Sequence, residues 1–259
     1  MIRRLALLPI ALMAVLSLVL SACASAPQAA PSLTDPKEIV TKGVTSLTGV
    51  KTFEFTGSFS GSVTVPQMGA LDLSKVTMSG AIDVANKSLK FNLKAPTVLG
   101  TEIDALVVGN AAYYKVEGML AAMLGGTPGK YTKADVPTAS DDPVAAATDI
   151  TKAVAELQAL LSKLPTPPTK AADEKCGTQD CYHVTMLVTA ADLKAIDPTA
   201  AAMDGDVTFD IWTQKSDYRP AKLSFSATSA EVGTVGMTLE LKYDVPVSVT
   251  APPADQIAP

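Results

Sequence analysis

Two cysteines and one histidine are the residues of this chain best suited to chemistry, and they lie close together. Cys176 and Cys181 flank a short loop that contains Gly177, and His183, the single histidine, follows two positions later. In an oxidising compartment this pair predicts a local disulfide, which adds little stability because a short loop loses little closure entropy. The alternative is a zinc site, which requires a fourth ligand from elsewhere in the chain.

Catalytic motifs are missing from the rest of the sequence. The chain has no G-x-S-x-G, no H-E-x-x-H and no glycine-rich phosphate loop. One histidine leaves few routes to a general base near neutral pH. Asp141-Asp142 is typical of a helix cap and Asp204-Gly205-Asp206 of a turn, and either needs further oxygen ligands to bind calcium. We therefore expect no enzymatic activity, no cofactor and no metal, and we expect Trp212 to be a core or edge residue.

The first residues have the pattern of an export signal. Arg3 and Arg4 precede an uncharged, mostly apolar stretch over residues 5–20, which is short for a membrane span. Leu20-Ser21-Ala22-Cys23 then matches the lipobox of bacterial lipoproteins, in which the cysteine sulfur receives a diacylglyceryl group and a peptidase cuts just before it. Two acyl chains hold a protein firmly on a membrane. The alternatives are an ordinary signal cleaved at an Ala-x-Ala site and an uncleaved anchor.

These features divide the chain into three parts. Residues 1–22 are the predicted signal peptide, residues 23–32 a lipidated flexible tether, and residues 33–259 a single domain. Removing residues 1–22 removes two arginines and no acidic residue, which takes the formal charge from −5 to −7. A mildly acidic chain without a basic stripe does not favour nucleic acid as a partner.

Two helices are predicted in the mature part. Asp35-Pro36 is typical of a capped helix start, with Glu38 in place to bond back to the cap, and the helix should end near Gly49. Asp142-Pro143 repeats this start. An apolar stripe then follows at spacings of four and three residues, until prolines stop the helix; its members are Ile150, Val154, Leu157, Leu161 and Leu164.

The other segments alternate with the period of β-strands. Residues 52–65 alternate without exception, with apolar residues and two glycines, Gly57 and Gly61, at the odd positions. Because glycine in a strand often marks a bend, we expect curvature here. Further alternation and short turns such as Gly109-Asn110 predict antiparallel hairpins before the second helix and about four strands after it. The fold class is α+β, with a strongly curved antiparallel sheet wrapped around the helices.

This arrangement behind a lipobox resembles the LppX/LprG family of lipoproteins, whose fold is similar to the LolA/LolB carriers. The resemblance lies in the order and pattern of segments through most of the mature chain, not in a catalytic motif. The segments that carry it are Val50-Lys51-Thr52-Phe53-Glu54-Phe55, residues 107–115, Phe209-Asp210-Ile211-Trp212 and residues 218–223.

The resemblance implies a half-open β-barrel that encloses a hydrophobic cavity with its helices, and a protein that carries acylated lipids or glycolipids within the cell envelope. It also implies an extracytoplasmic location, an anchor on the outer face of the cell membrane and an envelope transport protein as a further partner. The apolar segment at residues 118–126 is a candidate portal, or alternatively a short core helix. The cavity candidates are Phe53, Phe55, Gly57, Phe59, Gly61, Val63, Met78, Ile82, Met119, Leu120, Met123, Leu124, Val154, Leu157 and Leu161.

A second hypothesis assigns the same sheet to a non-enzymatic sensor or structural lipoprotein of the envelope, which binds a protein partner. A carrier needs a continuous apolar void of the size of a ligand site, whereas a sensor should fill that space with its own side chains.

Overall fold

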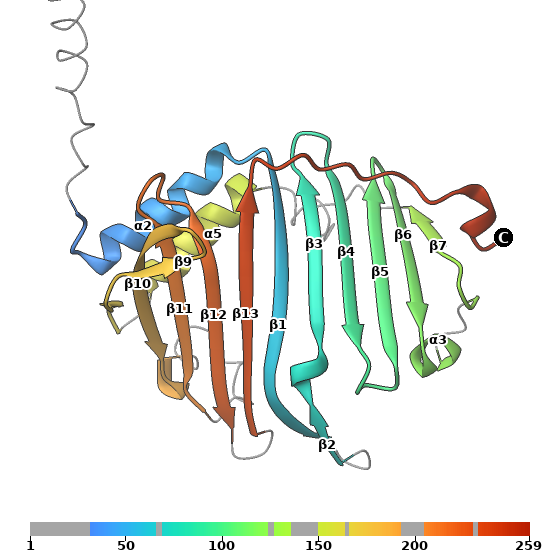
Figure 1. The fold of residues 1–259 in the computed structure, drawn as a ribbon, viewed down its shortest axis with the longest axis horizontal. Helices are drawn as coiled ribbons and strands as arrows, with labels where there is room; N and C mark the ends of the chain where they lie inside the picture. The colour runs from blue at the N-terminus through green and yellow to red at the C-terminus, as the bar shows by residue number, and fades with distance from the viewer. Residues whose placement is uncertain are drawn as a thin grey trace, which may run out of the picture. The chain divides into compact units, whose positions relative to one another are not determined.

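One antiparallel sheet of 13 strands organises the chain, with β1 (Thr52–Val65) at its centre (Figure 1). The computed structural model describes residues 32–65, 69–123, 127–135, 150–163, 166–192, 205–229 and 233–259. Residues 34–259 group as one unit, which is described here by itself. The predicted signal peptide, Cys23 and most of the predicted tether therefore lie outside the described residues.

The first helix, α2 (Pro36–Ser46), starts as its sequence predicts. The Asp35 carboxylate accepts a hydrogen bond from the backbone N–H of Lys37 at 2.9 Å, and Pro36 occupies the first helical position. Glu38 does not bond back to the cap; its carboxylate forms an ion pair with Lys42 at 3.0 Å, one turn along the helix. A 3₁₀ turn, η1 (Leu47–Gly49), ends the segment near the predicted position.

Strand β1 covers the residues 52–65 that the sequence predicted. The alternation of apolar and polar residues there suits a strand with one apolar face. It pairs with β3 on one side and with β13 on the other, so the N-terminal and C-terminal halves of the chain meet there. The strands on the β3 side are β2 (Gly69–Asp72), β3 (Thr77–Asp83), β4 (Ser88–Ala95), β5 (Thr101–Val108), β6 (Ala111–Glu117) and β7 (Thr132–Asp135). Those on the β13 side are β8 (Thr169–Lys170), β9 (Glu174–Cys176), β10 (Gln179–Val188), β11 (Val207–Gln214), β12 (Pro220–Ser229) and β13 (Gly233–Tyr243).

Short turns connect several pairs of neighbouring strands, such as β3 with β4 and β5 with β6, as the sequence predicts. Gly109 in the β5–β6 turn has a φ of +60°, the conformation that hairpin turns of this kind require. Four of the shorter strands, β2, β7, β8 and β9, were not predicted because each is only two to four residues long. The remaining described helices are η2 (Leu73–Lys75), α3 (Met119–Met123), α5 (Ile150–Lys163) and η4 (Ala254–Gln256).

The helices α2 and α5 lie together against the end of the sheet formed by β10 to β13 (Figure 1). α2 contacts β10 and β11, and Ile39 and Val184 between them are fully buried. Gly43 permits this close packing, since a Cβ there would lie 3.3 Å from Oγ1 of Thr213. At the other end of the sheet, the short helix α3 contacts β5 and β6. That helices are wrapped by the sheet along its whole width stays a prediction.

Candidate functional site

A continuous apolar row crosses the sheet on the face that carries the odd positions of β1. The register places one residue of each of nine neighbouring strands in this row. Because side chains alternate between the two faces of a strand, these residues share one face of the sheet. The row consists of Val184, Ile211, Leu223, Leu239, Gly57, Met78, Leu93, Ile103 and Val116.

Coverage of this face changes from one end to the other. At the β10 end, Val184 is fully buried beneath α2. Most of the other members of the row are half-buried. On the same face, Phe209 of β11, the strand next to β10, is 38% exposed, and Tyr114 of β6 is 45% exposed. Among the described residues, the sheet therefore keeps exposed aromatic side chains on its apolar face, which is typical of a ligand or partner site.

Six of the cavity candidates share this face. Phe55 lies near Phe91 of β4, with their ring centroids 6.4 Å apart, and its ring occupies the space that a side chain at Gly80 would take. Sequence reasoning missed Phe91, although its place in the alternation of β4 was a usable signal. The six candidates are Phe53, Phe55, Gly57, Phe59, Met78 and Ile82.

Two other candidates from β1 lie beyond this group. Gly61 is exposed, has a φ of +88°, and a Cβ there would lie 1.9 Å from the carbonyl oxygen of Thr234. It therefore marks a close approach of β1 to β13, where glycine is required, and it offers no lining for a cavity. Val63 pairs with Leu71 of β2, away from β3.

The candidate portal contains the five-residue helix α3. Its Met119 and Met123 are 59% and 72% exposed, Leu120 is half-buried, and Ala121 is the member that is buried. The segment is therefore helical, but it is not the core helix that the alternative predicted. Leu124 lies outside the described residues.

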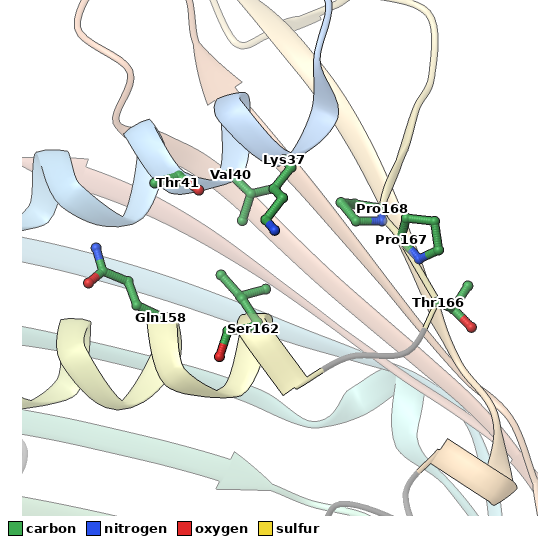
Figure 2. Close-up of a pocket in the computed structure, with 9 residues that line it drawn as sticks. Lys37, Val40, Thr41, Gln158, Ser162, Thr166, Pro167 and Pro168 are labelled. Carbon is green, nitrogen blue, oxygen red and sulfur yellow. The ribbon is translucent and has the colours of Figure 1, made fainter.

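The stripe of α5 contributes to a pocket between this helix and α2 (Figure 2). Val154 is buried and Leu161 lines the pocket, while the side chain of Leu157 lies outside the described residues. The pocket has a volume of about 400 Å³, which lies within the range of small-molecule sites. Its lining residues are Lys37, Val40, Thr41, Gln158, Leu161, Ser162, Thr166, Pro167 and Pro168.

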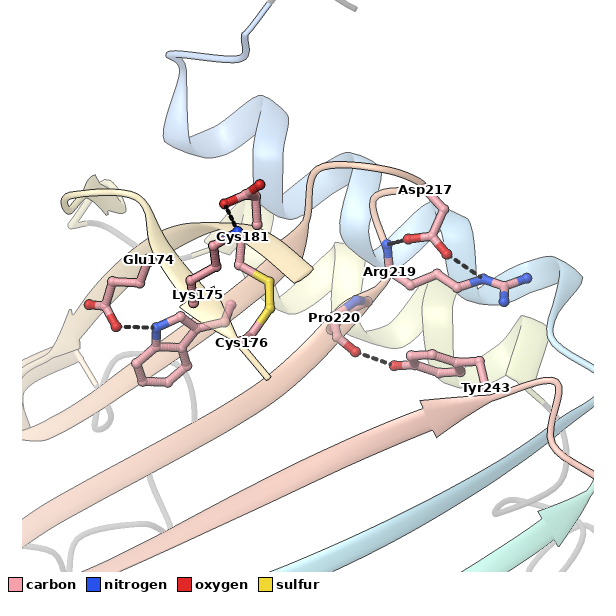
Figure 3. Close-up of a disulfide and its surroundings, with 10 residues drawn as sticks. Glu174, Lys175, Cys176, Cys181, Asp217, Arg219, Pro220 and Tyr243 are labelled. Carbon is pink, nitrogen blue, oxygen red and sulfur yellow. Dashed lines mark hydrogen bonds and ion pairs between the residues drawn. A yellow bond between two sulfur atoms is a disulfide. The ribbon is translucent and has the colours of Figure 1, made fainter. Parts of the chain in front are cut away.

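The predicted disulfide joins Cys176 of β9 to Cys181 of β10 (Figure 3). Because both sulfurs are used in this bond, they are not available to zinc. The ring nitrogens of His183 instead face two carboxylates, with Nδ1 3.0 Å from Glu174 and Nε2 2.9 Å from Asp210.

Trp212 lies in the same cluster, on the sheet face opposite the apolar row. Its ring stacks on His183 with centroids 4.3 Å apart, and its Nε1 donates a hydrogen bond to Glu174 at 3.2 Å. The Lys222 ammonium lies 3.5 Å from the centroid of the ring. Trp212 is only 8% exposed, so it is a structural residue held by its neighbours, as the sequence analysis expected.

Reducing the disulfide is expected to shift the fluorescence of Trp212 towards longer wavelengths. The bond holds β9, and with it Glu174, against the tryptophan, so its loss should let water reach the ring. Because Trp212 is the single tryptophan, emission spectra of the full chain with and without dithiothreitol report on this cluster alone. An unchanged spectrum with two free thiols would contradict the prediction, and an unchanged far-ultraviolet circular dichroism spectrum would show that the sheet stays folded.

The turn between β11 and β12 uses its polar groups for structure. The Tyr243 hydroxyl donates to the Pro220 carbonyl at 2.7 Å, and burial raises the pKa of this phenol. A hydrogen bond from Arg219 lowers the pKa of the Asp244 carboxyl, and Arg219 also pairs with Asp217 (Figure 3). Because these groups bind one another, the polar residues of the segment 218–223 have partners within the protein. No ligand is needed to explain their presence.

Comparison with solved structures identifies the fold. LprF from Mycobacterium bovis superposes with a TM-score of 0.53 at 15% sequence identity, over 84% of this chain and 96% of that one. This chain shares its fold with LprF. The lipoprotein LppX from Mycobacterium tuberculosis is similar at 13% identity over 84% of this chain and all of LppX, with a TM-score of 0.49.

The fold shared with LprF confirms, at the level of the fold, the resemblance to the LppX/LprG family that the sequence indicated. No protein-family model and no curated protein matches the chain by sequence. Within the described residues, every helix is too short or too polar to cross a membrane.

Proposed function

We propose that this chain is an extracytoplasmic lipoprotein that binds the acyl chains of a lipid or glycolipid on its apolar sheet face and carries the lipid within the cell envelope. The observation that supports this most directly is the apolar row across nine strands, in which Val184 is fully buried and most of the other described members are only half-buried. The shared fold with LprF adds support.

The energetics of such binding are favourable. Each methylene group that leaves water contributes ~0.8 kcal/mol, so ten of them contribute roughly 8 kcal/mol before the costs of association, which are at least ~4 kcal/mol. The proposal includes no catalytic step, since His183 is stacked on Trp212 and its side chain is only 13% exposed.

The lipid should stabilise the protein, because a ligand that binds only the folded state raises the free energy of unfolding by about 2.7 kcal/mol at a hundred times its Kd. We expect the full chain, purified from its host membrane in an uncharged detergent, to carry acyl lipid in native mass spectrometry. After this lipid is removed, added dioleoylphosphatidylglycerol should raise the melting temperature. If no lipid co-purifies and no acyl lipid raises the melting temperature, the proposal is wrong and the sensor hypothesis is favoured.

The proposed anchor is the diacylglyceryl group on Cys23. A Cys23→Ala chain should stay unprocessed or be released from the membrane, because this lipid is the one strong anchor that the sequence indicates. Normal maturation and membrane fractionation of this variant would contradict the lipobox assignment.

A further inference from the structure

The pocket between α2 and α5 combines an apolar wall with a single charge. Four of its lining residues are apolar, namely Val40, Leu161, Pro167 and Pro168. Lys37 is the one charged residue of the lining, and Figure 2 shows its ammonium pointing into the space between the helices. Such a lining suits a ligand that has both an aliphatic part and an anionic group.

Most other polar groups of the pocket are engaged with the protein itself. The Ser162 hydroxyl donates to the Ala159 carbonyl at 2.7 Å, and the Gln158 amide donates to Thr45 Oγ1 at 3.2 Å. The Thr166 hydroxyl donates to the Asp192 carboxylate at 3.4 Å. The polar wall is therefore held in place by internal bonds.

Lys37 differs from these groups. It makes no ion pair with any residue of the described ranges, whereas the neighbouring Glu38 is paired with Lys42. It also lies in the first turn of α2, where the partial positive charge of the helix end disfavours a cation and favours an anion. Lys37 is exposed and has no ion pair within the described ranges, so its ammonium is available as a donor to a ligand.

We propose that this pocket selects anionic acylated lipids, with Lys37 binding the anionic head group and the apolar wall contacting the adjacent part of the acyl chain. This inference rests on the proposed function and adds a substrate class to it. The helices that form the pocket also cover one end of the apolar face, which places the head group close to where acyl chains would lie. A free inorganic anion would leave the four apolar residues without a partner, so the lipid is the better fit.

The test compares two lipids that differ in charge. Dissociation constants of the full chain are measured for dioleoylphosphatidylglycerol and for uncharged dioleoylglycerol, in the same uncharged detergent. Lys37→Gln should weaken binding of the anionic lipid by roughly tenfold, as expected for the loss of a charge-assisted hydrogen bond, and leave binding of dioleoylglycerol unchanged. The matched control is Lys75→Gln, which removes an exposed lysine of η2 outside the pocket and should change neither constant.

Several outcomes would overturn this assignment. Equal binding of the two lipids by the unsubstituted chain, or an equal loss of both in Lys37→Gln, would show that the pocket does not select charge while leaving the proposed function intact. Competition by millimolar inorganic phosphate against the anionic lipid would show that the site takes the free anion. If the unsubstituted chain binds neither lipid, this inference fails; if in addition no acyl lipid co-purifies with the chain, the proposed function fails with it.

Discussion

Replacing Gly61 with alanine should destabilise the protein by roughly 3 kcal/mol, more than the same change at Gly109. The backbone at Gly61 has a φ of +88°, which costs a residue with a Cβ about 1–2 kcal/mol. The new Cβ would also lie 1.9 Å from the Thr234 carbonyl oxygen, so β1 and β13 would have to separate locally. Urea denaturation followed by circular dichroism measures the change in the free energy of unfolding.

Gly109 provides the control for this prediction. Its φ is +60°, but a Cβ there would have no atom within 4 Å, so Gly109→Ala should show the cost of the backbone conformation alone. Equal losses of the free energy of unfolding in the two variants would mean that the contact with Thr234 contributes nothing to the destabilisation. The contacts of a new side chain differ at Gly57, because a Cβ there would contact the flexible side chains of Met78 and Leu239 and not the backbone.

Replacing Ala105 with tryptophan should remove most of the lipid bound per folded protein. Ala105 lies on the apolar face of β5 between Phe91 and Tyr114 and is half-buried, so a large ring there should occupy the surface that acyl chains need. Its backbone is ordinary strand, unlike that of Gly61, so the variant should fold. Native mass spectrometry of the purified chain measures the bound lipid, and the melting temperature of the lipid-free protein reports on folding.

Lys90→Trp is the matched control, because Lys90 is exposed on the other face of the neighbouring strand β4. This variant should bind as much lipid as the unsubstituted chain. An Ala105→Trp protein that folds normally and retains its full complement of lipid would show that this part of the sheet does not hold acyl chains.

Local features of the fold were predictable from the sequence. The cap at Asp35, the alternation over residues 52–65 and the turn at Gly109 each depend on neighbours within a few positions, so their residue types carry the signal. The disulfide was predictable for the same reason, since its two cysteines are only five positions apart. The resemblance to the LppX/LprG family depended on the order of such local features.

The short strands were harder to predict. Strands β8 and β9 contain two and three residues, which is too few for an alternation to show, and each forms only because β10 lies beside it. The sequence predicted curvature at Gly57 and Gly61 but did not show which of the two adopts a positive φ, and the structure places it at Gly61.

The sequence by itself determined which residues are apolar on the longer strands and where α2 starts, because these properties depend on local periodicity and capping. The other predicted helix start, Asp142-Pro143, lies outside the described residues. Only the tertiary structure decided which strands pair with one another and which helices pack together. The pairing of β1 with β13 joins segments from opposite ends of the chain, and it creates the apolar row of nine strands. The packing of α2 beside α5 likewise brings Lys37 to Pro167 and Pro168, since contacts at such separations depend on the whole sheet and leave no periodic trace in the chain.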